Sequence, residues 1–314
     1  MSDLIKAMTY DYPERIPVSL WFMPATWKKY GDEISRLCAE YPDLAPQGMT
    51  PDKVPMPDSY RYGSFTDEWG CVWSNLHEGM ESIVTGHPVK TREDILKLEI
   101  PTNRDGRMPH GFMYLRLLDL RGFEEAMMDF AEEAPELDVL IDKVLRYNLI
   151  QLDVVLPDAG PVAIFGDDLG MQQGLAIGAA KWRKYLKPCY KALYDKVHAS
   201  GRYVYMHTDG RIIDIMDDLV ECGVNMINPQ FRANGLEDLV RVCKGRIPIN
   251  LDLDRQMFPF ATPAQLKEHV AQVVQALYLP QGGLGIYAEF SPDMPVENMA
   301  AVLDALRQWR DYRG

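Results

Sequence analysis

The sequence lacks the patterns that mark several large classes of protein. Its five cysteines are scattered and include no CxxC pair, the spacing that is typical of zinc sites and redox motifs. No apolar run approaches the roughly 18 residues that cross a bilayer. The first residues, Met-Ser-Asp-Leu-Ile-Lys, do not form an apolar signal segment. We therefore expect reduced thiols in a cytoplasmic protein that is not associated with a membrane.

Positive charge is also scarce. The 314 residues include 33 lysines and arginines against 46 aspartates and glutamates, which gives a formal net charge of −13. This balance argues against nucleic acid or an anionic membrane as a partner. The chain contains neither GxGxxG nor GxxxxGKS/T, so the sequence does not support dinucleotide or P-loop binding. It also shows no internal repeat and no low-complexity tract.

The apolar patterns of the sequence predict strands that alternate with helices. Short apolar segments predict strands at 17–22, 112–118, 161–165, 203–206, 225–228, 247–251 and 284–288. Apolar spacings of three and four predict helices at 137–155, 181–200, 212–220, 236–243 and from about 295. Thr262, Pro263 and Gln265 have the pattern of a capping box and predict the start of a further helix.

This alternation predicts the fold class. Strands that alternate with helices imply a parallel sheet. Residues 23–110 are rich in proline, glycine and aromatics, and we expect them to form an excursion with lid elements and a hairpin at about 65–84. The sequence therefore predicts one α/β domain over residues 1–314, a (β/α)8 TIM barrel with a decorated N-terminal region. A doubly wound open sheet is the alternative.

Polar residues follow most of the predicted strands. In a barrel these strand ends meet at one face, and here they supply Asp167, Asp168, His207, Asp209, Asn228, Gln230, Asp252, Asp254 and Glu289. So many carboxylates around one imidazole would repel one another unless a cation or protons intervene. His207 and Asp209 are two positions apart in an extended segment and point to the same side. This pattern predicts a metal site, and a buried histidine bonded to a backbone carbonyl is the alternative.

The other strand-end residues have predicted roles of their own. One of Asp167 and Asp168 is expected to cap a helix, while the other holds a substrate hydroxyl or acts as a general base. Asn228, Gln230 and Asp252 are candidates for orienting a substrate. Trp21 and Phe22 end the first strand, where they form an apolar wall for a substrate or fill the top of the barrel. The alternating Trp69, Cys71 and Trp73 suggest a lid element or simple packing.

Several segments, in order and spacing, resemble the uroporphyrinogen decarboxylase superfamily, and most of all its cobalamin-dependent methyltransferase branch. They are Arg15–Val18, Thr66–Gly70, Gly166–Gly170, His207–Gly210, Ile227–Gln230, Ile286–Glu289 and Pro295–Asn298. The resemblance implies zinc bound through a His-x-Cys pair and a later cysteine. The matching positions here are His207, Asp209 and Glu289, so carboxylates replace both thiolates. This harder ligand set leaves the metal open between zinc, manganese and iron(II).

The resemblance implies a function as well. It implies transfer of a methyl group between a small substrate and the cobalamin of a separate corrinoid protein, because this chain contains no DxHxxG sequence for carrying the cofactor. The carboxylate ligands favour an oxygen substrate, and a methyl ether of an aromatic compound is our specific expectation. A decarboxylase of tetrapyrroles and a non-catalytic binding barrel are the alternatives. The oligomeric state, including a homodimer, is left open.

Overall fold

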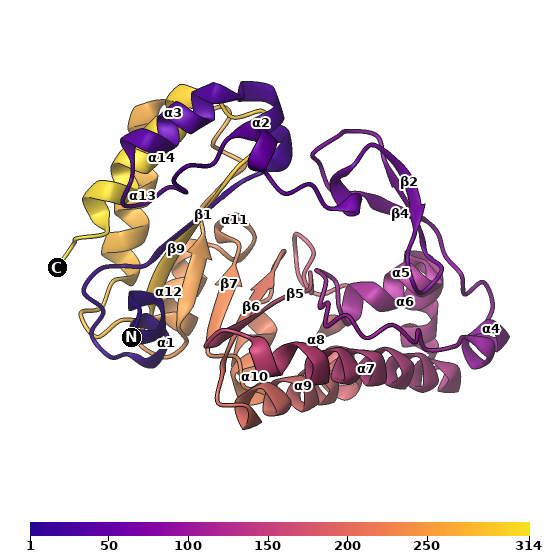
Figure 1. The fold of residues 1–314 in the computed structure, drawn as a ribbon. Helices are drawn as coiled ribbons and strands as arrows, with labels where there is room; N and C mark the ends of the chain where they lie inside the picture. Colours follow the sequence, from indigo (N-terminus) through magenta and orange to yellow (C-terminus); the bar gives the residue numbers. More distant parts are fainter. The chain divides into compact units, whose positions relative to one another are not determined.

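The structure, a computed structural model, describes residues 1–314 and divides into two compact units (Figure 1). Unit 1 comprises Met1–Ser64, Ser74–Ile83 and Gln230–Gly314, and unit 2 comprises Phe65–Trp73 and Val84–Pro229. Each unit combines helices with three parallel strands. None of the helices has both the length and the apolar character that a membrane span requires.

Unit 1 is organised around the strands in the order β1-β9-β8. The register pairs Leu20 with Ala288 and Leu251 with Ile286. Helices α13 and α14 pack against each other, as Figure 1 shows. The elements are α1 (Asp3–Thr9), β1 (Val18–Phe22), α2 (Pro24–Tyr30), α3 (Asp32–Glu40), α11 (Phe231–Asn234), α12 (Leu236–Cys243), β8 (Ile249–Asp252), α13 (Pro263–Leu277), β9 (Leu284–Phe290) and α14 (Val296–Trp309), with 3-10 turns at Pro51–Lys53 and Asp58–Tyr60.

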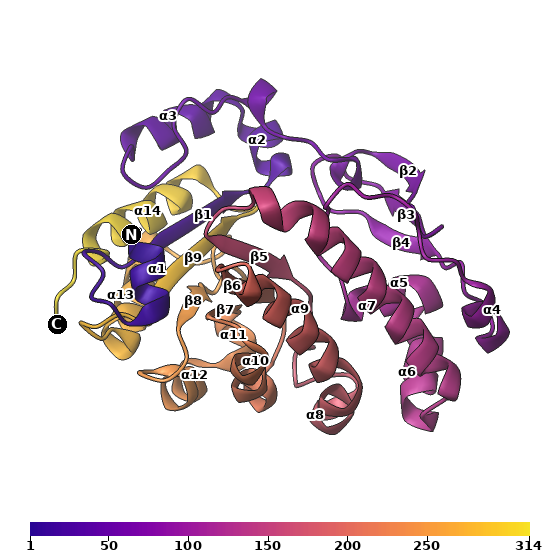
Figure 2. The same ribbon diagram turned by 60° about the horizontal axis from the view of Figure 1, so that its bottom comes forward.

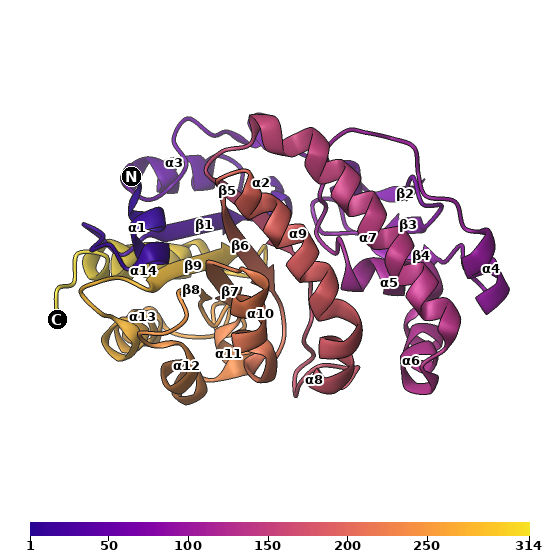
Figure 3. The same ribbon diagram turned by 90° about the horizontal axis from the view of Figure 1, so that it is seen from below.

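Unit 2 holds the strands in the order β5-β6-β7. Helices α7 and α9 lie side by side, and α9 also packs against β6 (Figures 2 and 3). The elements are α4 (Arg92–Lys97), α5 (Tyr114–Arg121), α6 (Phe123–Glu132), α7 (Pro135–Val155), β5 (Val162–Gly166), α8 (Gly178–Lys181), α9 (Lys187–Ala199), β6 (Tyr203–Thr208), α10 (Met216–Cys222) and β7 (Met226–Pro229), with a π-helical turn at Trp182–Leu186 and 3-10 turns at Leu156–Asp158 and Ile213–Ile215.

Local sequence signals account for several of these boundaries. The capping box at the start of α13 is confirmed: Thr262 accepts a hydrogen bond from the Gln265 N–H, and the Gln265 side chain accepts one from the Thr262 N–H. Gly223 ends α10 with a φ of 110°, in the left-handed region that glycine adopts readily. All residues of β7 are buried, as is usual for a parallel strand covered on both faces.

One element of the predicted fold is wrong, and one feature is not confirmed. The sequence predicts a strand at 112–118, but most of this segment belongs to helix α5. Met113, Leu117 and Leu120 are buried at helical spacing, and the Asp167 carboxylate accepts hydrogen bonds from the first N–H groups of the helix. The structure contains six parallel strands, three in each unit, so the complete eight-stranded barrel of the prediction is not confirmed. The α/β class and the other predicted strands are confirmed.

The excursion between residues 23 and 110 contains helices α2, α3 and α4 and a small separate sheet. The sheet consists of β2 (Gly63–Thr66), β3 (Val72–Asn75) and β4 (Ile83–Gly86). Trp69 is buried and packs edge-on against Tyr147, with ring centroids 5.1 Å apart. The Trp73 indole donates a hydrogen bond to Asp67. Both tryptophans therefore have packing contacts within unit 2, and the lid role that the sequence suggests stays a prediction.

Candidate functional site

The candidate site lies in unit 2, where β5 and β6 end. The segments that follow these two strands continue their pairing past the sheet. The Asp167 N–H donates to the carbonyl of His207 at 3.1 Å, and the Gly170 N–H donates to the carbonyl of Asp209, also at 3.1 Å. The Leu169 N–H donates to the Thr208 hydroxyl at 3.0 Å. The backbone therefore holds Asp168 and His207 side by side.

Two glycines permit this close approach. A Cβ on Gly210 would lie 2.1 Å from backbone atoms of Gly170, and a Cβ on Gly170 would lie 2.6 Å from the Arg211 nitrogen. Contacts this short do not occur for real side chains, so neither position accepts alanine without moving the backbone. The glycines of the Gly166–Gly170 and His207–Gly210 segments thus fix the spacing of the site.

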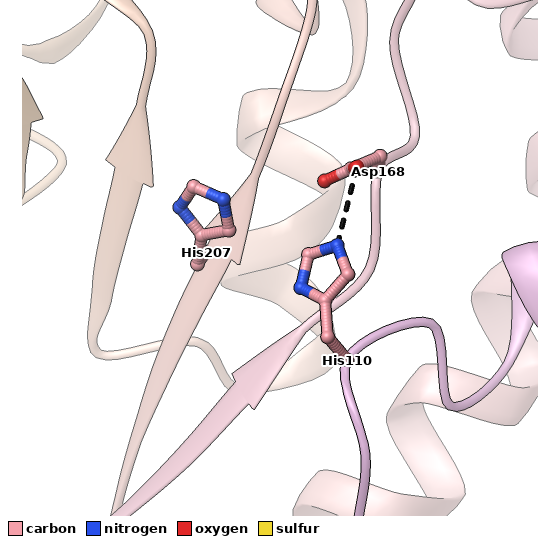
Figure 4. A group of neighbouring side chains, drawn as sticks. All are labelled: His110, Asp168 and His207. Atoms are coloured by element: carbon pink, nitrogen blue, oxygen red, sulfur yellow. Dashed lines mark ion pairs between the residues drawn. The ribbon is translucent and has the colours of Figure 1, made fainter. Parts of the chain in front are cut away.

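Three side chains converge at this point: His110, Asp168 and His207 (Figure 4). Each offers one ligand atom, and these atoms all lie within 4.8 Å of one another. The His110 Nε2 donates to Asp168 Oδ2 at 3.1 Å. The two imidazole rings have centroids 5.6 Å apart and planes inclined by 47°, so they approach the same volume from two directions.

His207 has a polar partner at each ring nitrogen. Its Nδ1 lies 2.8 Å from the side-chain oxygen of Asn228, its register partner on β7. Its Nε2 lies 3.3 Å from Asp209 Oδ1, which confirms that these two side chains point to the same side. Burial lowers the pKa of His207, but the bond and charge of Asp209 and the charge of Asp168 outweigh it, so the pKa is raised.

Asp168 is the carboxylate of the group. Burial raises its pKa, but the bond from His110 and the charges of His110 and His207 outweigh that effect, and its pKa is lowered. Its other oxygen accepts a hydrogen bond from the Asp209 N–H at 3.1 Å. Asp168 is therefore an ionised carboxylate held between two imidazoles, a set that metal ions bind well.

His110 reaches the site from the loop before α5. The Gly111 N–H donates to the carbonyl of Gly166 at 2.8 Å, which anchors this loop to the end of β5. A Cβ on Gly166 would lie 2.5 Å from His110 Nδ1, so the absence of a side chain there makes room for the ring. Local sequence patterns do not identify His110. Its Pro109-His110-Gly111 setting in a turn was the only local signal, because the contact spans more than fifty residues of chain.

Asp167 has a different environment from its neighbour. It is wholly buried and accepts hydrogen bonds from the backbone N–H groups of Met113, Tyr114 and Leu115 and from the Tyr190 hydroxyl. Burial raises its pKa, and these donors oppose the rise. Of the aspartate pair, Asp167 is thus the one that caps a helix, although that helix is α5 rather than the next one along the chain. Its predicted part in catalysis stays a prediction.

The remaining predicted site residues of the first unit lie at the ends of β1, β8 and β9. The Glu289 carboxylate accepts a hydrogen bond from Arg255 at 2.6 Å and one from the Tyr287 hydroxyl at 3.3 Å. Trp21 is 42% exposed, whereas Phe22 is buried against Phe290.

Asp252 is fully buried at the end of β8, with Arg255 Nε 3.6 Å from its Oδ2. Gln230 forms an isolated parallel bridge with Asp252. The roles predicted for Gln230, Asp252 and Glu289 in binding stay predictions.

The fold and the polar ends of the strands define an α/β protein of the kind that places its chemistry at the carboxyl ends of parallel strands. Residues 118–309 match the sequence model of the uroporphyrinogen decarboxylase (URO-D) family. Since the match covers more than half of the chain, the protein belongs to this family.

One solved structure similar to the chain is a methyltransferase from Methanosarcina mazei, with a TM-score of 0.69 and 14% sequence identity over 98% of this chain and 97% of that one. At this identity the likeness shows a shared fold. No curated protein matches the chain.

Proposed function

We propose that the protein is a metal-assisted methyltransferase that moves a methyl group from a methyl ether to the cobalamin of a separate corrinoid protein. The observation that carries this proposal is the group of two imidazoles and one carboxylate at the strand ends of a URO-D family fold. The likeness in fold to a methyltransferase supports the reaction class. In this reaction the methyl–oxygen bond breaks, its electron pair stays on oxygen, and cobalt supplies the pair for the new bond.

The three side chains fit a metal ion. Ligand atoms around a tetrahedral ion with bonds of about 2.1 Å lie about 3.4 Å from one another, and here they already lie within 4.8 Å. His110 has 34% of its side chain exposed, so a small rotation can close the difference. When bound, the metal would supply Lewis acidity to the oxygen that carries the methyl group. Two histidines and a carboxylate suit zinc and also iron(II).

Two sets of ligands are compatible with these residues. The first is His110, Asp168 and His207, which the structure brings together. The second, implied by the family resemblance, is His207, Asp209 and Glu289. We favour the first because Glu289 forms an ion pair with Arg255 at 2.6 Å, and ligation would have to break that pair. In this arrangement Asp209, 3.3 Å from His207 Nε2, orients the imidazole or the substrate.

The choice of substrate follows from the ligands. Imidazole and carboxylate are harder donors than the thiolates that the family resemblance implies. A harder site favours an oxygen ligand, and coordination of an ether oxygen would make the resulting phenolate or alkoxide a better leaving group. The ionised Asp168 and the histidines would position this oxygen within a rigid backbone frame, which reduces the entropic cost of reaching the reactive geometry.

Metal analysis followed by turnover tests the proposal. We expect the purified protein to bind about one zinc or iron(II) ion, and to form methylcobalamin from at least one of a panel of methoxy compounds when cob(I)alamin is supplied. His110→Ala and His207→Ala should lose the metal, whereas Glu289→Gln should retain it. Loss of the metal in Glu289→Gln but not in His110→Ala would favour the second ligand set. Turnover of a porphyrinogen without any methyl transfer would instead support a decarboxylase.

A further inference from the structure

The side chain of Asn228 contacts one ring nitrogen of His207 and can therefore determine the orientation of the imidazole. It lies on β7 directly opposite His207 in the parallel register, and only 2% of the residue is exposed. Its side-chain oxygen is 2.8 Å from His207 Nδ1. The sequence predicts that Asn228 orients a substrate, which stays a prediction, and this contact joins it to the imidazole as well.

We propose that Asn228 is a positioning residue that keeps the Nδ1 proton on His207 and so directs Nε2 toward the ligand. The inference rests on the metal site of the proposed function. A neutral imidazole carries its proton on one nitrogen and a lone pair on the other. When Nδ1 donates to the Asn228 oxygen, the lone pair is on Nε2, the nitrogen beside Asp209. Such partners of ligating histidines fix both the tautomer and the orientation of the ring.

The buried setting makes this control strong. Asn228 and His207 lie on neighbouring strands whose backbones are joined by hydrogen bonds, so neither side chain can move away from the other by a shift of a loop. Replacement of Asn228 by leucine, which has a similar size, would leave the Nδ1–H facing an apolar group. The ring would then turn, or move its proton to Nε2, to regain a partner.

Three variants test the assignment. Asn228→Leu removes the acceptor, Asn228→Asp retains an acceptor in the same place, and Asn75→Leu is a matched control. Asn75 is also a buried asparagine, with 4% exposure, and it donates to the carbonyl of Met80 in unit 1. Zinc affinity is measured by competition with a chromophoric chelator, and the fold is monitored by circular dichroism.

The zinc affinity of Asn228→Leu should fall by about 10- to 100-fold, the effect that is usual for the partner of a ligating histidine. Asn228→Asp should bind zinc at least as tightly as the wild type, and Asn75→Leu should bind it as the wild type does. Selective 15N labelling of the six histidines gives a second measurement. The His207 signal, assigned by its absence in His207→Ala, should show the Nδ1–H tautomer in zinc-bound wild type and Asn228→Asp.

Equal zinc affinity in Asn228→Leu and the wild type would overturn the inference while leaving the proposed function standing. An Nε2–H tautomer in the zinc-bound wild type would overturn it as well. Failure of the wild-type protein to bind zinc, iron(II) or manganese would overturn the proposed metal site and this inference with it. These results are distinct, so failure of the positioning role can be separated from failure of the function.

Discussion

Replacement of Gly166 by alanine should damage the candidate site through one contact. Gly166 ends β5, and its backbone angle is not in the left-handed region, so alanine is compatible with the local conformation. The added Cβ, however, would lie 2.5 Å from His110 Nδ1, whereas ordinary contacts begin at 3.4 Å. The ring would therefore have to move by roughly 1 Å, far beyond the ~0.2 Å over which ligand distances vary in metal sites.

The displacement predicts a specific loss of metal binding. Misplacement of a site group by about 1 Å is enough to cost about 100-fold in function, and we expect zinc affinity to fall by about 10- to 100-fold, equivalent to about 1.4–2.7 kcal/mol. The measurement is chelator competition with purified protein. Gly160→Ala is the matched control, because Gly160 has no atom within 4 Å of the position of a Cβ.

A double-mutant cycle separates this mechanism from general damage. If Gly166→Ala acts by displacing His110, it should have no further effect on the weaker zinc affinity that remains in a His110→Ala background. Equal, additive losses in both backgrounds would refute the reasoning, as would wild-type affinity in Gly166→Ala. Wild-type affinity in Gly166→Ala would mean that the His110 ring can still reach the ion beside an alanine, so its position would not depend on glycine at residue 166.

Two further predictions concern stability. Burial lowers the pKa of His269 from 6.5 to about 4, so between these pH values the unfolded chain binds a proton that the folded protein does not. The free energy of unfolding should therefore fall, as the pH is lowered from 6.5 to 4, by up to about 1.4 kcal/mol per pH unit. Urea titrations should show a shallower fall in His269→Gln. Tyr190→Phe removes a 2.6 Å bond to buried Asp167 and should cost about 2 kcal/mol. Tyr194→Phe, whose hydroxyl contacts only the weak acceptor Met206 Sδ, should cost well under 1 kcal/mol in the same titration, and equal losses would contradict the role of Asp167.

The sequence predicted well the short strands that are buried along their whole length, such as β7 and β8. β8 ends in Asp252 as expected, and Asn228 stands one residue before the end of β7. Helix ends were predictable where a local capping signal exists, as at Thr262 and Gly223. These signals act within a few residues, so they can be read from the sequence without knowledge of the tertiary structure.

The error at α5 shows the limit of such local signals. Residues 112–118 include enough large apolar side chains for a buried strand, and a short apolar run does not distinguish a strand from a buried helix. The deciding interaction is the Asp167 carboxylate, which binds three N–H groups at the start of α5. That contact joins residues more than fifty positions apart, and no local pattern reports it.

The same limit explains why only part of the candidate site was predicted. His207 and Asp209 were recognised because a strand places positions i and i+2 on one side, and their side chains do approach within 3.3 Å. His110 lies in a loop whose position depends on the Gly111–Gly166 hydrogen bond and on the missing side chain of Gly166. Periodicity therefore identified the part of the site on a strand and could not identify the part on a loop.

Two sets of metal ligands compete for His207, one with Glu289 and one with His110 and Asp168, and they differ in the interactions that metal binding would break. Family positions suggest Glu289, but recruiting it requires loss of the 2.6 Å ion pair with Arg255, whose side chain is 24% exposed. Loss of this short contact from a partly buried pair is costly, even though the Asp252 carboxylate also lies 3.6 Å from Arg255 Nε. His110 and Asp168 already face each other at 3.1 Å, and an ion would replace the shared proton with its own positive charge. The arrangement with His110 and Asp168 therefore needs the smaller rearrangement, and for this reason we expect His110→Ala, rather than Glu289→Gln, to remove most of the metal binding.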